Sequence, residues 1–525
     1  MQRKNSRTTN TIFNFTSSIG GQLITIIMQF VVRTVFIHTL GKSYLGINGL
    51  FSNILSMLSL AEFGVGSAIL YKLYEPIAHD NHHRIALLMK LYKSIYRVIG
   101  IAVALIGCLL IPFLPRLITD YDKLVALKIN VPLIFLLYLL KTVSSYLFFS
   151  YKSAIVKANQ KEYLLNVISY FFTIAAGFLQ IIILLIWPNF MIYVAIMVAQ
   201  IIFQNIACAY LSDKMYPYIN EKTNERIATA EIKDLFKDCS ALFLYKLNGV
   251  VLKATDNIVL SVFLGLDFVA MYSNYYVFYT SINTLFNKIF NSVSHSLGNL
   301  HTGTDKNHEY NIFESVILIT AILGGTAGVG LAVVSDEFVN VWIGQDWILK
   351  QPFAMLMGIE VATLALRIAI AKYRTTMGLF QQAMYRPIAG MIINLVISVV
   401  LVKYWGISGV LVGTIVADWS TTMWYDPIII HKYGFEGLHS SKRYFVKLLK
   451  YVITISLIGV VDSVICSNIF CGYGWTSVFI HAVICAITVP AGLIAISIKT
   501  LEGKYVYNLI MRYVKKVKGK VKRKK

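Results

Sequence analysis

Eleven ionisable side chains fall inside long apolar segments of this sequence, where a charge is costly to keep. Six are basic and five are acidic: Arg33, Lys141, Lys246, Lys253, Lys288 and Arg367, with Glu62, Asp256, Glu360, Asp418 and Asp462. Ionisable residues inside a membrane span usually face a cavity or a partner, and they often mark the path of a substrate or an ion. These positions are therefore the first candidates for a functional site.

Depth within the apolar segments separates the basic candidates. Lys288, Arg367 and the acidic Asp418 lie near predicted inner ends, and Lys288 can extend its ammonium group to the lipid headgroups, so we set these three aside. Three basic residues lie nearer to mid-span: Arg33, Lys141 and Lys253. The alternative to a binding role is a structural ion pair, for example between Arg33 and Glu62.

The acidic residues Glu62, Asp256 and Glu360 are equal candidates for binding a coupling ion, either a proton or Na⁺. Asp256 lies three residues after Lys253, so the two share one helix face and could pair with each other instead. Acidic residues in the spans nearly equal basic ones in number. The sequence alone therefore does not define a strongly cationic cavity.

Other motifs that could carry chemistry fail on spacing. Gly41-Lys42-Ser43 resembles the end of a phosphate-binding loop, but Phe36 stands where that loop needs its first glycine. The six cysteines are scattered without metal-ligand spacing. Cys466 and Cys471 fall in one predicted external loop and could pair, although two unrelated thiols are the preferred interpretation. We therefore predict no catalytic residue, no metal site and no cofactor.

The segments that carry these residues are membrane spans. Of the 525 residues, 57% are hydrophobic and only 14% are charged, with a mean hydropathy of +0.65. A helix needs roughly 20 apolar residues to cross the hydrocarbon layer, and about 14 continuous runs reach that length. Continuous runs exclude the alternating pattern of a membrane β-strand. We predict an all-α polytopic membrane protein of about 14 transmembrane helices, whose first apolar run is the first span.

The lysines and arginines orient these spans. One set of alternate loops holds 36 of the 48 basic residues, the opposite loops hold six, and six lie inside spans. Because basic residues stay on the cytoplasmic side, both termini are predicted to be cytoplasmic. The basic tail from Lys499 to Lys525 suits an anionic lipid surface better than a nucleic acid.

Two passages of the sequence resemble each other. Leu40-Gly41 and Leu264-Gly265 each follow an apolar span and precede a short polar link, which predicts two antiparallel helix hairpins. The spacing of these turns suggests duplicated halves of about six spans each, a common transporter plan with the substrate site between the halves. In the ninth span, Gly324 and Gly328 have the spacing that lets two membrane helices approach closely.

The repeat defines four predicted regions. Residues 1–212 form an N-terminal lobe of spans 1–6, and residues 213–239 form a cytoplasmic interfacial linker. Residues 240–435 form a C-terminal lobe of spans 7–12. Residues 436–525 hold two extra spans and the basic cytoplasmic tail.

The same passages resemble a known family. The residues that carry the first resemblance are Arg33, Leu40-Gly41, Tyr44-Leu45-Gly46, Asn53, Leu60-Ala-Glu-Phe-Gly64, Ala68-Ile69 and Leu73-Tyr-Glu-Pro76. Those that carry the second are Thr255-Asp-Asn-Ile-Val-Leu-Ser261, Phe263-Leu-Gly265 and Met271-Tyr-Ser-Asn274. They look like the polysaccharide flippases of capsule and O-antigen pathways, in the multidrug/oligosaccharidyl-lipid/polysaccharide exporter superfamily.

This resemblance implies a transporter in the bacterial cytoplasmic membrane, not an enzyme. It would move an undecaprenyl-diphosphate-linked oligosaccharide from the inner to the outer leaflet by alternating access, through a cavity between two lobes. The diphosphate would need cations, for which Arg33 is our first candidate, with Lys253 and Lys141 behind it, because the planar guanidinium donates two parallel hydrogen bonds. Coupling to Na⁺ or H⁺ would use the three acids.

Two other functions stay open at this point. An ion-coupled multidrug or small-molecule antiporter of the same superfamily would need acidic sites in a largely uncharged cavity, which Arg33 argues against. A membrane-embedded glycan polymerase or transferase usually needs a sizeable external loop, and the external links here are short. We expect a monomer that contacts membrane lipids and binds no nucleic acid. An association with a polysaccharide polymerase or glycosyltransferases stays open.

Overall fold

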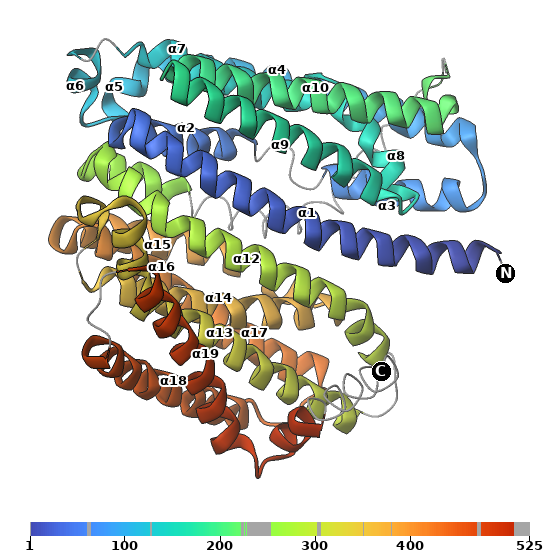
Figure 1. Ribbon diagram of the computed structural model, residues 1–525. Helices are drawn as coiled ribbons and strands as arrows, with labels where there is room; N and C mark the ends of the chain where they lie inside the picture. Colours follow the sequence, from blue (N-terminus) through green and yellow to red (C-terminus); the bar gives the residue numbers. More distant parts are fainter. Residues whose placement is uncertain are drawn as a thin grey trace, which may run out of the picture. The chain divides into compact units, whose positions relative to one another are not determined.

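The protein is α-helical throughout the part that the computed structural model describes. That part comprises residues 2–59, 65–126, 129–221, 225, 227, 254–301, 306–349, 351–379, 381–469 and 474–508. Every regular element in these ranges is a helix (Figure 1). The predicted all-α fold is therefore confirmed.

The long helices are apolar enough to cross a bilayer. Nine helices in the described ranges pass that test by length and composition, or ten if the bent pair Val131–Leu147 and Ser150–Ala158 forms one span. A polytopic membrane protein is confirmed by this result. The total of 14 spans and the cytoplasmic position of both termini stay predictions.

The chain divides into two compact units, residues 1–270 and residues 271–525. The boundary falls near the start of helix α12 (Leu266–His301). The predicted lobe boundaries near residues 212 and 240 stay predictions, because residues 228–253 lie outside the described ranges.

Unit 1 is built around contacts between its long helices. Its helices are α1 (Gln2–Leu40), α2 (Lys42–Leu58), α3 (Val65–Ala78), α4 (His82–Leu110), α5 (Leu114–Leu117), α6 (Tyr121–Ala126), α7 (Val131–Leu147), α8 (Ser153–Ala158), α9 (Glu162–Ile186), α10 (Phe190–Met215) and the unlabelled helix Ala254–Phe263. Helix α1 packs along α9, and α7 packs against both α4 and α10.

Asparagine side chains start three of these spans. Asn81 accepts a hydrogen bond from the backbone of Arg84 at the start of α4, and Asn130 and Asn189 do the same for α7 and α10. Each cap satisfies a backbone N–H that the first helical turn leaves without a partner, worth about 1 kcal/mol.

Unit 2 has α13 at its centre. Besides most of α12, its helices are α13 (Lys306–Ile343), α14 (Phe353–Thr376), α15 (Arg386–Trp405), α16 (Ile407–Ser420), α17 (Thr422–Ile429), α18 (Ser441–Ile469) and α19 (Trp475–Ser497). Helix α13 packs against α14, α18 and α19, and α15 packs against α16 (Figure 1).

The glycine face predicted on the ninth span lies in the α13–α14 contact. A Cβ atom built on Gly328 would come within 2.5 Å of the Gly358 carbonyl oxygen, and one on Gly324 within 2.6 Å of the Ala365 Cβ. Only hydrogen fits at these points, so the predicted close approach of two helices is confirmed.

The two predicted Leu-Gly turns are confirmed as well. Gly41 connects α1 to α2 with a φ of +82°, and Gly265 connects the helix Ala254–Phe263 to α12 with a φ of +93°. Glycine adopts this left-handed conformation without the steric cost that a Cβ atom adds. A glycine with a positive φ therefore precedes the second helix of both hairpins.

Candidate functional site

The predicted basic residues lie on two helices of unit 1. Arg33 is half-buried on α1, and Lys141 is half-buried on α7. Lys253 lies outside the described residues, so its predicted role and its pairing with Asp256 stay predictions.

Among the predicted acids, Asp256 and Glu360 are both buried. Asp256 is 4% exposed on the helix Ala254–Phe263, and Glu360 is 6% exposed on α14. Glu62 lies outside the described residues, so the predicted Arg33–Glu62 pair stays a prediction. The two described acids belong to different units, and each is considered within its own unit.

Arg33 belongs to a polar and aromatic group that we call the Arg33 cluster: Arg33, Asn48, Tyr138 and Tyr193. The Arg33 guanidinium and the Tyr138 hydroxyl each lie within electrostatic range of the Tyr193 hydroxyl. The Tyr138 hydroxyl donates a hydrogen bond to Asn48 Oδ1. Four helices, α1, α2, α7 and α10, each contribute one member.

Aromatic packing fixes this group in place. The Phe190 ring lies 5.7 Å from Phe36, 5.0 Å from Tyr44 and 6.4 Å from Tyr138, measured between ring centroids. Phe36 also packs edge-on against Tyr193 at 4.9 Å. Such pairs add about 0.5–1.5 kcal/mol each beyond the area they bury, so the helices around Arg33 are firmly joined.

Lys141 follows Tyr138 by three residues and lies on the same face of α7. In the ranges that the structure describes, its ammonium group makes no hydrogen bond and no ion pair. A membrane cation without a partner is expensive unless it meets water or an anion. Lys141 is therefore the described candidate with a charge left for a ligand.

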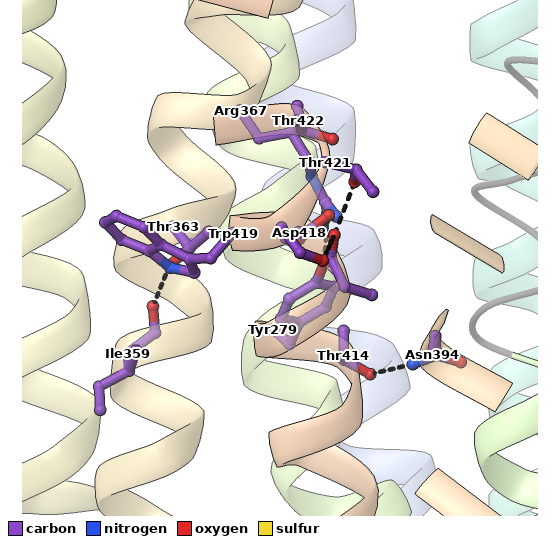
Figure 2. A network of polar contacts seen from close by, with 12 residues as sticks. Tyr279, Ile359, Thr363, Arg367, Asn394, Thr414, Asp418, Trp419, Thr421 and Thr422 are labelled. Atoms are coloured by element: carbon purple, nitrogen blue, oxygen red, sulfur yellow. Dashed lines mark hydrogen bonds and ion pairs between the residues drawn. The ribbon is translucent and has the colours of Figure 1, made fainter. Parts of the chain in front are cut away.

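Unit 2 holds a different arrangement, in which the arginine has partners. Arg367 Nη1 lies 2.5 Å from Asp418 Oδ2, and Arg367 Nη2 donates to the Tyr279 hydroxyl at 3.0 Å (Figure 2). Glu360 interacts electrostatically with both Arg367 and Tyr279. We call these four residues the Arg367 network; it joins α12, α14 and α16.

Polar contacts extend this arrangement along the neighbouring helices. Trp419 donates to the Thr363 hydroxyl at 3.1 Å, and the Asn394 amide donates to the Thr414 hydroxyl at 2.9 Å (Figure 2). They tie α16 to α14 on one side and to α15 on the other. The network therefore sits in a helix group that is cross-linked by hydrogen bonds.

The Arg367 network was not predicted from the sequence, because the depth of Arg367 and Asp418 in their spans indicated a position near the inner headgroups. The two residues are 51 positions apart, and nothing in either segment alone indicates the pairing. One signal was present: Glu360 and Arg367 are seven residues apart, which places them on one face of α14.

No metal centre is found in the described ranges, where no group of three or more His, Cys, Asp and Glu side chains could hold an ion. Four cysteines fall in these ranges, Cys108, Cys208, Cys466 and Cys485, and all four are free thiols. Cys471, the possible partner of Cys466, lies outside them.

The fold is that of membrane flippases and transporters. The lipid II flippase MurJ, in an inward closed conformation, matches with a TM-score of 0.65 at 13% identity, covering 92% of this chain and 98% of that one. An inward-facing multidrug resistance MATE family transporter of the MOP superfamily matches with a TM-score of 0.55 at 12% identity, covering 80% and 96%. The Vibrio cholerae MATE transporter VcmN in its bent form matches with a TM-score of 0.50 at 13% identity, covering 82% and 98%.

The sequence places the chain within this class. The model of the polysaccharide biosynthesis protein family matches residues 12–294, more than half of the chain. The chain belongs to the polysaccharide biosynthesis protein family, and the predicted family is confirmed. The comparison with curated protein sequences finds no match.

Proposed function

We propose that this protein flips an undecaprenyl-diphosphate-linked oligosaccharide repeat unit from the inner to the outer leaflet of the bacterial cytoplasmic membrane. Membership of the polysaccharide biosynthesis family supports a glycan substrate, and the fold shared with a lipid II flippase supports a lipid-linked one. The transporter would work by alternating access, without catalysis, for surface polysaccharide biosynthesis such as O-antigen or capsule.

The observation that carries this proposal is Lys141, a half-buried cation without a partner among the described residues, one turn from Tyr138 of the Arg33 cluster. A diphosphate loses its hydration when it enters an apolar protein, and fixed cations replace part of that hydration. In this proposal Arg33 binds the diphosphate with its guanidinium fork, and Lys141 adds a second positive charge. Lys253 is proposed as the third member.

Transport against a gradient would need a coupling ion, for which we propose Na⁺ or H⁺. Asp256 and Glu360 are the described candidates, and both are carboxylates buried within membrane helices. Glu62 is the third candidate. Each would bind the ion in one conformation and release it in the other, so that the ion gradient drives the cycle.

The experiment compares lipid-linked intermediates in a deletion strain complemented with variants. Lys141→Met and Arg33→Met remove one charge each and keep an apolar side chain of similar length, and Arg116→Met removes an exposed charge that has no partner in the described ranges. We expect Lys141→Met and Arg33→Met to accumulate inner-leaflet intermediates and lose surface glycan, while Arg116→Met behaves like the wild type. Normal export by both Lys141→Met and Arg33→Met, at wild-type protein levels, would remove the two residues from the mechanism.

The second candidate function is an ion-coupled antiporter of multidrug or small-molecule substrates, which the MATE transporter fold favours. An antiporter would export cationic drugs and leave lipid-linked intermediates unchanged in the deletion strain. Drug susceptibility and intermediate analysis of the same strain therefore separate the two functions. In either case we propose a monomer that works beside polysaccharide polymerases or glycosyltransferases without needing them to form its cavity.

A further inference from the structure

A row of five side chains on α4 has cations at one end and exposed apolar groups at the other, which is complementary to an anionic lipid. Lys93, Arg97, Ile101, Leu105 and Leu109 follow one another at intervals of four residues, so they form one continuous ridge that turns around the helix by about 40° per step. The first two are cations. The last three are exposed apolar residues, with 55%, 63% and 70% of their surfaces accessible.

Among the described residues, nothing neutralises the two cations. In the described ranges neither Lys93 nor Arg97 makes a hydrogen bond or an ion pair. Lys93 instead lies within electrostatic range of two other cations, Arg97 and Lys152. Like charges this close repel each other, and an anion bound between them would relieve the repulsion.

The neighbouring acid does not cancel this charge. Asp213 on α10 receives the Lys152 ammonium on both carboxylate oxygens at 2.6 Å, and it also accepts from the Asn220 amide at 2.8 Å. Lys152 and Asp213 therefore balance each other. Lys93 and Arg97 leave a net charge of two at the surface between α4 and the turn that holds Lys152.

The depth of this row matches a lipid phosphate. Between Arg97 and Arg116 the chain holds 18 residues without a charge, from Val98 to Pro115. At 1.5 Å per residue they span about 27 Å, close to the ~30 Å of the hydrocarbon core. The two arginines therefore mark the two headgroup levels, with Arg97 at the predicted inner one.

We propose that Lys93 and Arg97 form a binding site for an anionic diacyl phospholipid of the inner leaflet. The phosphate contacts both cations, and an acyl chain lies along Ile101, Leu105 and Leu109. From Arg97 to Leu109 the row is about 18 Å long, the length of one leaflet and much shorter than a polyprenyl chain. The site is separate from the Arg33 cluster and does not depend on the proposed transport function.

The test measures which lipids stay bound to the purified, full-length protein. Native mass spectrometry of protein equilibrated with equal amounts of phosphatidylglycerol and phosphatidylcholine gives the preference directly. Each cation near an anionic lipid contributes about fivefold, so the double variant K93Q/R97Q should reduce the phosphatidylglycerol preference roughly 30-fold. The control K214Q/K432Q also removes two exposed charges from the predicted inner side and should keep the preference.

Two results would overturn the site. One is an unchanged preference in K93Q/R97Q when thermal unfolding shows that the variant is folded. The other is displacement of phosphatidylglycerol from the wild type by undecaprenyl diphosphate but not by cardiolipin, which would assign the site to the polyprenyl lipid. Displacement by cardiolipin, with no effect of the double variant on glycan export, supports the phospholipid site.

Discussion

Arg367 Nη1 lies 2.5 Å from Asp418 Oδ2, and this pair joins α14 to α16 inside unit 2. The Asp418 side chain is 5% exposed and the Arg367 side chain 23%, so water reaches little of either charge. Lys141 in unit 1 has no such partner in the described ranges. The Arg367 charge is therefore paired within the structure, and the Lys141 charge is available to a ligand.

The first prediction concerns the cost of breaking the Arg367–Asp418 pair. Asp418→Ala leaves a largely buried guanidinium without its carboxylate, and we expect a loss of about 3–5 kcal/mol in the free energy of unfolding. The double variant R367M/D418L replaces both charges by apolar groups and should recover most of that loss. Thermal unfolding in detergent measures both; equal destabilisation by the two variants would contradict a simple ion pair.

Each unit holds a further aspartate in an ion pair. In unit 1, Lys152, between α7 and α9, contacts Asp213 near the end of α10. In unit 2, Arg386 at the start of α15 and Arg374 near the end of α14 contact Asp426 on α17 at 3.3 Å and 3.6 Å. The predicted duplication makes these helices equivalent. In each half, a cation near the connection between the fourth and fifth spans would then contact an aspartate late in the sixth span.

These two pairs should respond differently to removal of the acid. Asp213 is 36% exposed and contacts one buried cation, Lys152, whereas Asp426 is fully buried between two arginines. We expect Asp426→Ala to cost about 3–5 kcal/mol in unfolding free energy. Asp213→Ala leaves one cation without its acid, Lys152, whose side chain is 9% exposed, and should cost less, about 1–3 kcal/mol. Chemical denaturation of the two variants gives the comparison, and a larger loss for Asp213→Ala would contradict the burial argument.

Much of the backbone plan follows from the sequence, because it depends on local patterns. Gly41 and Gly265 are recognisable as turns since each stands between an apolar run and a polar link. The close approach at Gly328 is likewise visible as small-residue spacing along α13. These features need only the helix period and the conformational range of glycine.

The candidate site is predictable only in part, because its contacts join distant positions. The sequence indicates that Arg33 and Lys141 are unusual, but Tyr138 and Asn48 are 90 residues apart and their hydrogen bond leaves no local pattern. The position of a charged residue along its predicted span does not distinguish an arginine that has a partner, such as Arg367, from a cation without one. That distinction requires the packing of helices against each other.

The glycine contact between α13 and α14 gives the third prediction. A Cβ atom at position 328 meets the Gly358 carbonyl oxygen at 2.5 Å, and backbone cannot move aside as a flexible side chain can. Gly328→Ala should therefore separate the two helices and cost about 1–3 kcal/mol, the range for overpacking a core. Gly330→Ala, where a Cβ atom meets nothing within 4 Å, is the matched control and should not destabilise the protein. Thermal unfolding of the pair tests the contact, and equal melting temperatures would show that it is looser than described.

The last prediction separates a coupling role for Glu360 from a structural one. Glu360 is 6% exposed and interacts electrostatically with Arg367 and Tyr279, so it could bind an ion or simply support the Arg367 network. Glu360→Gln keeps the shape of the side chain and removes its charge. If Glu360 carries the coupling ion, the variant should melt within a few degrees of the wild type yet lose the dependence of transport on the Na⁺ or proton gradient in proteoliposomes. A structural role predicts the reverse, a lowered melting temperature with gradient dependence retained in the protein that remains folded. Asp256→Asn, measured in the same way, shows whether the second buried acid carries the ion instead.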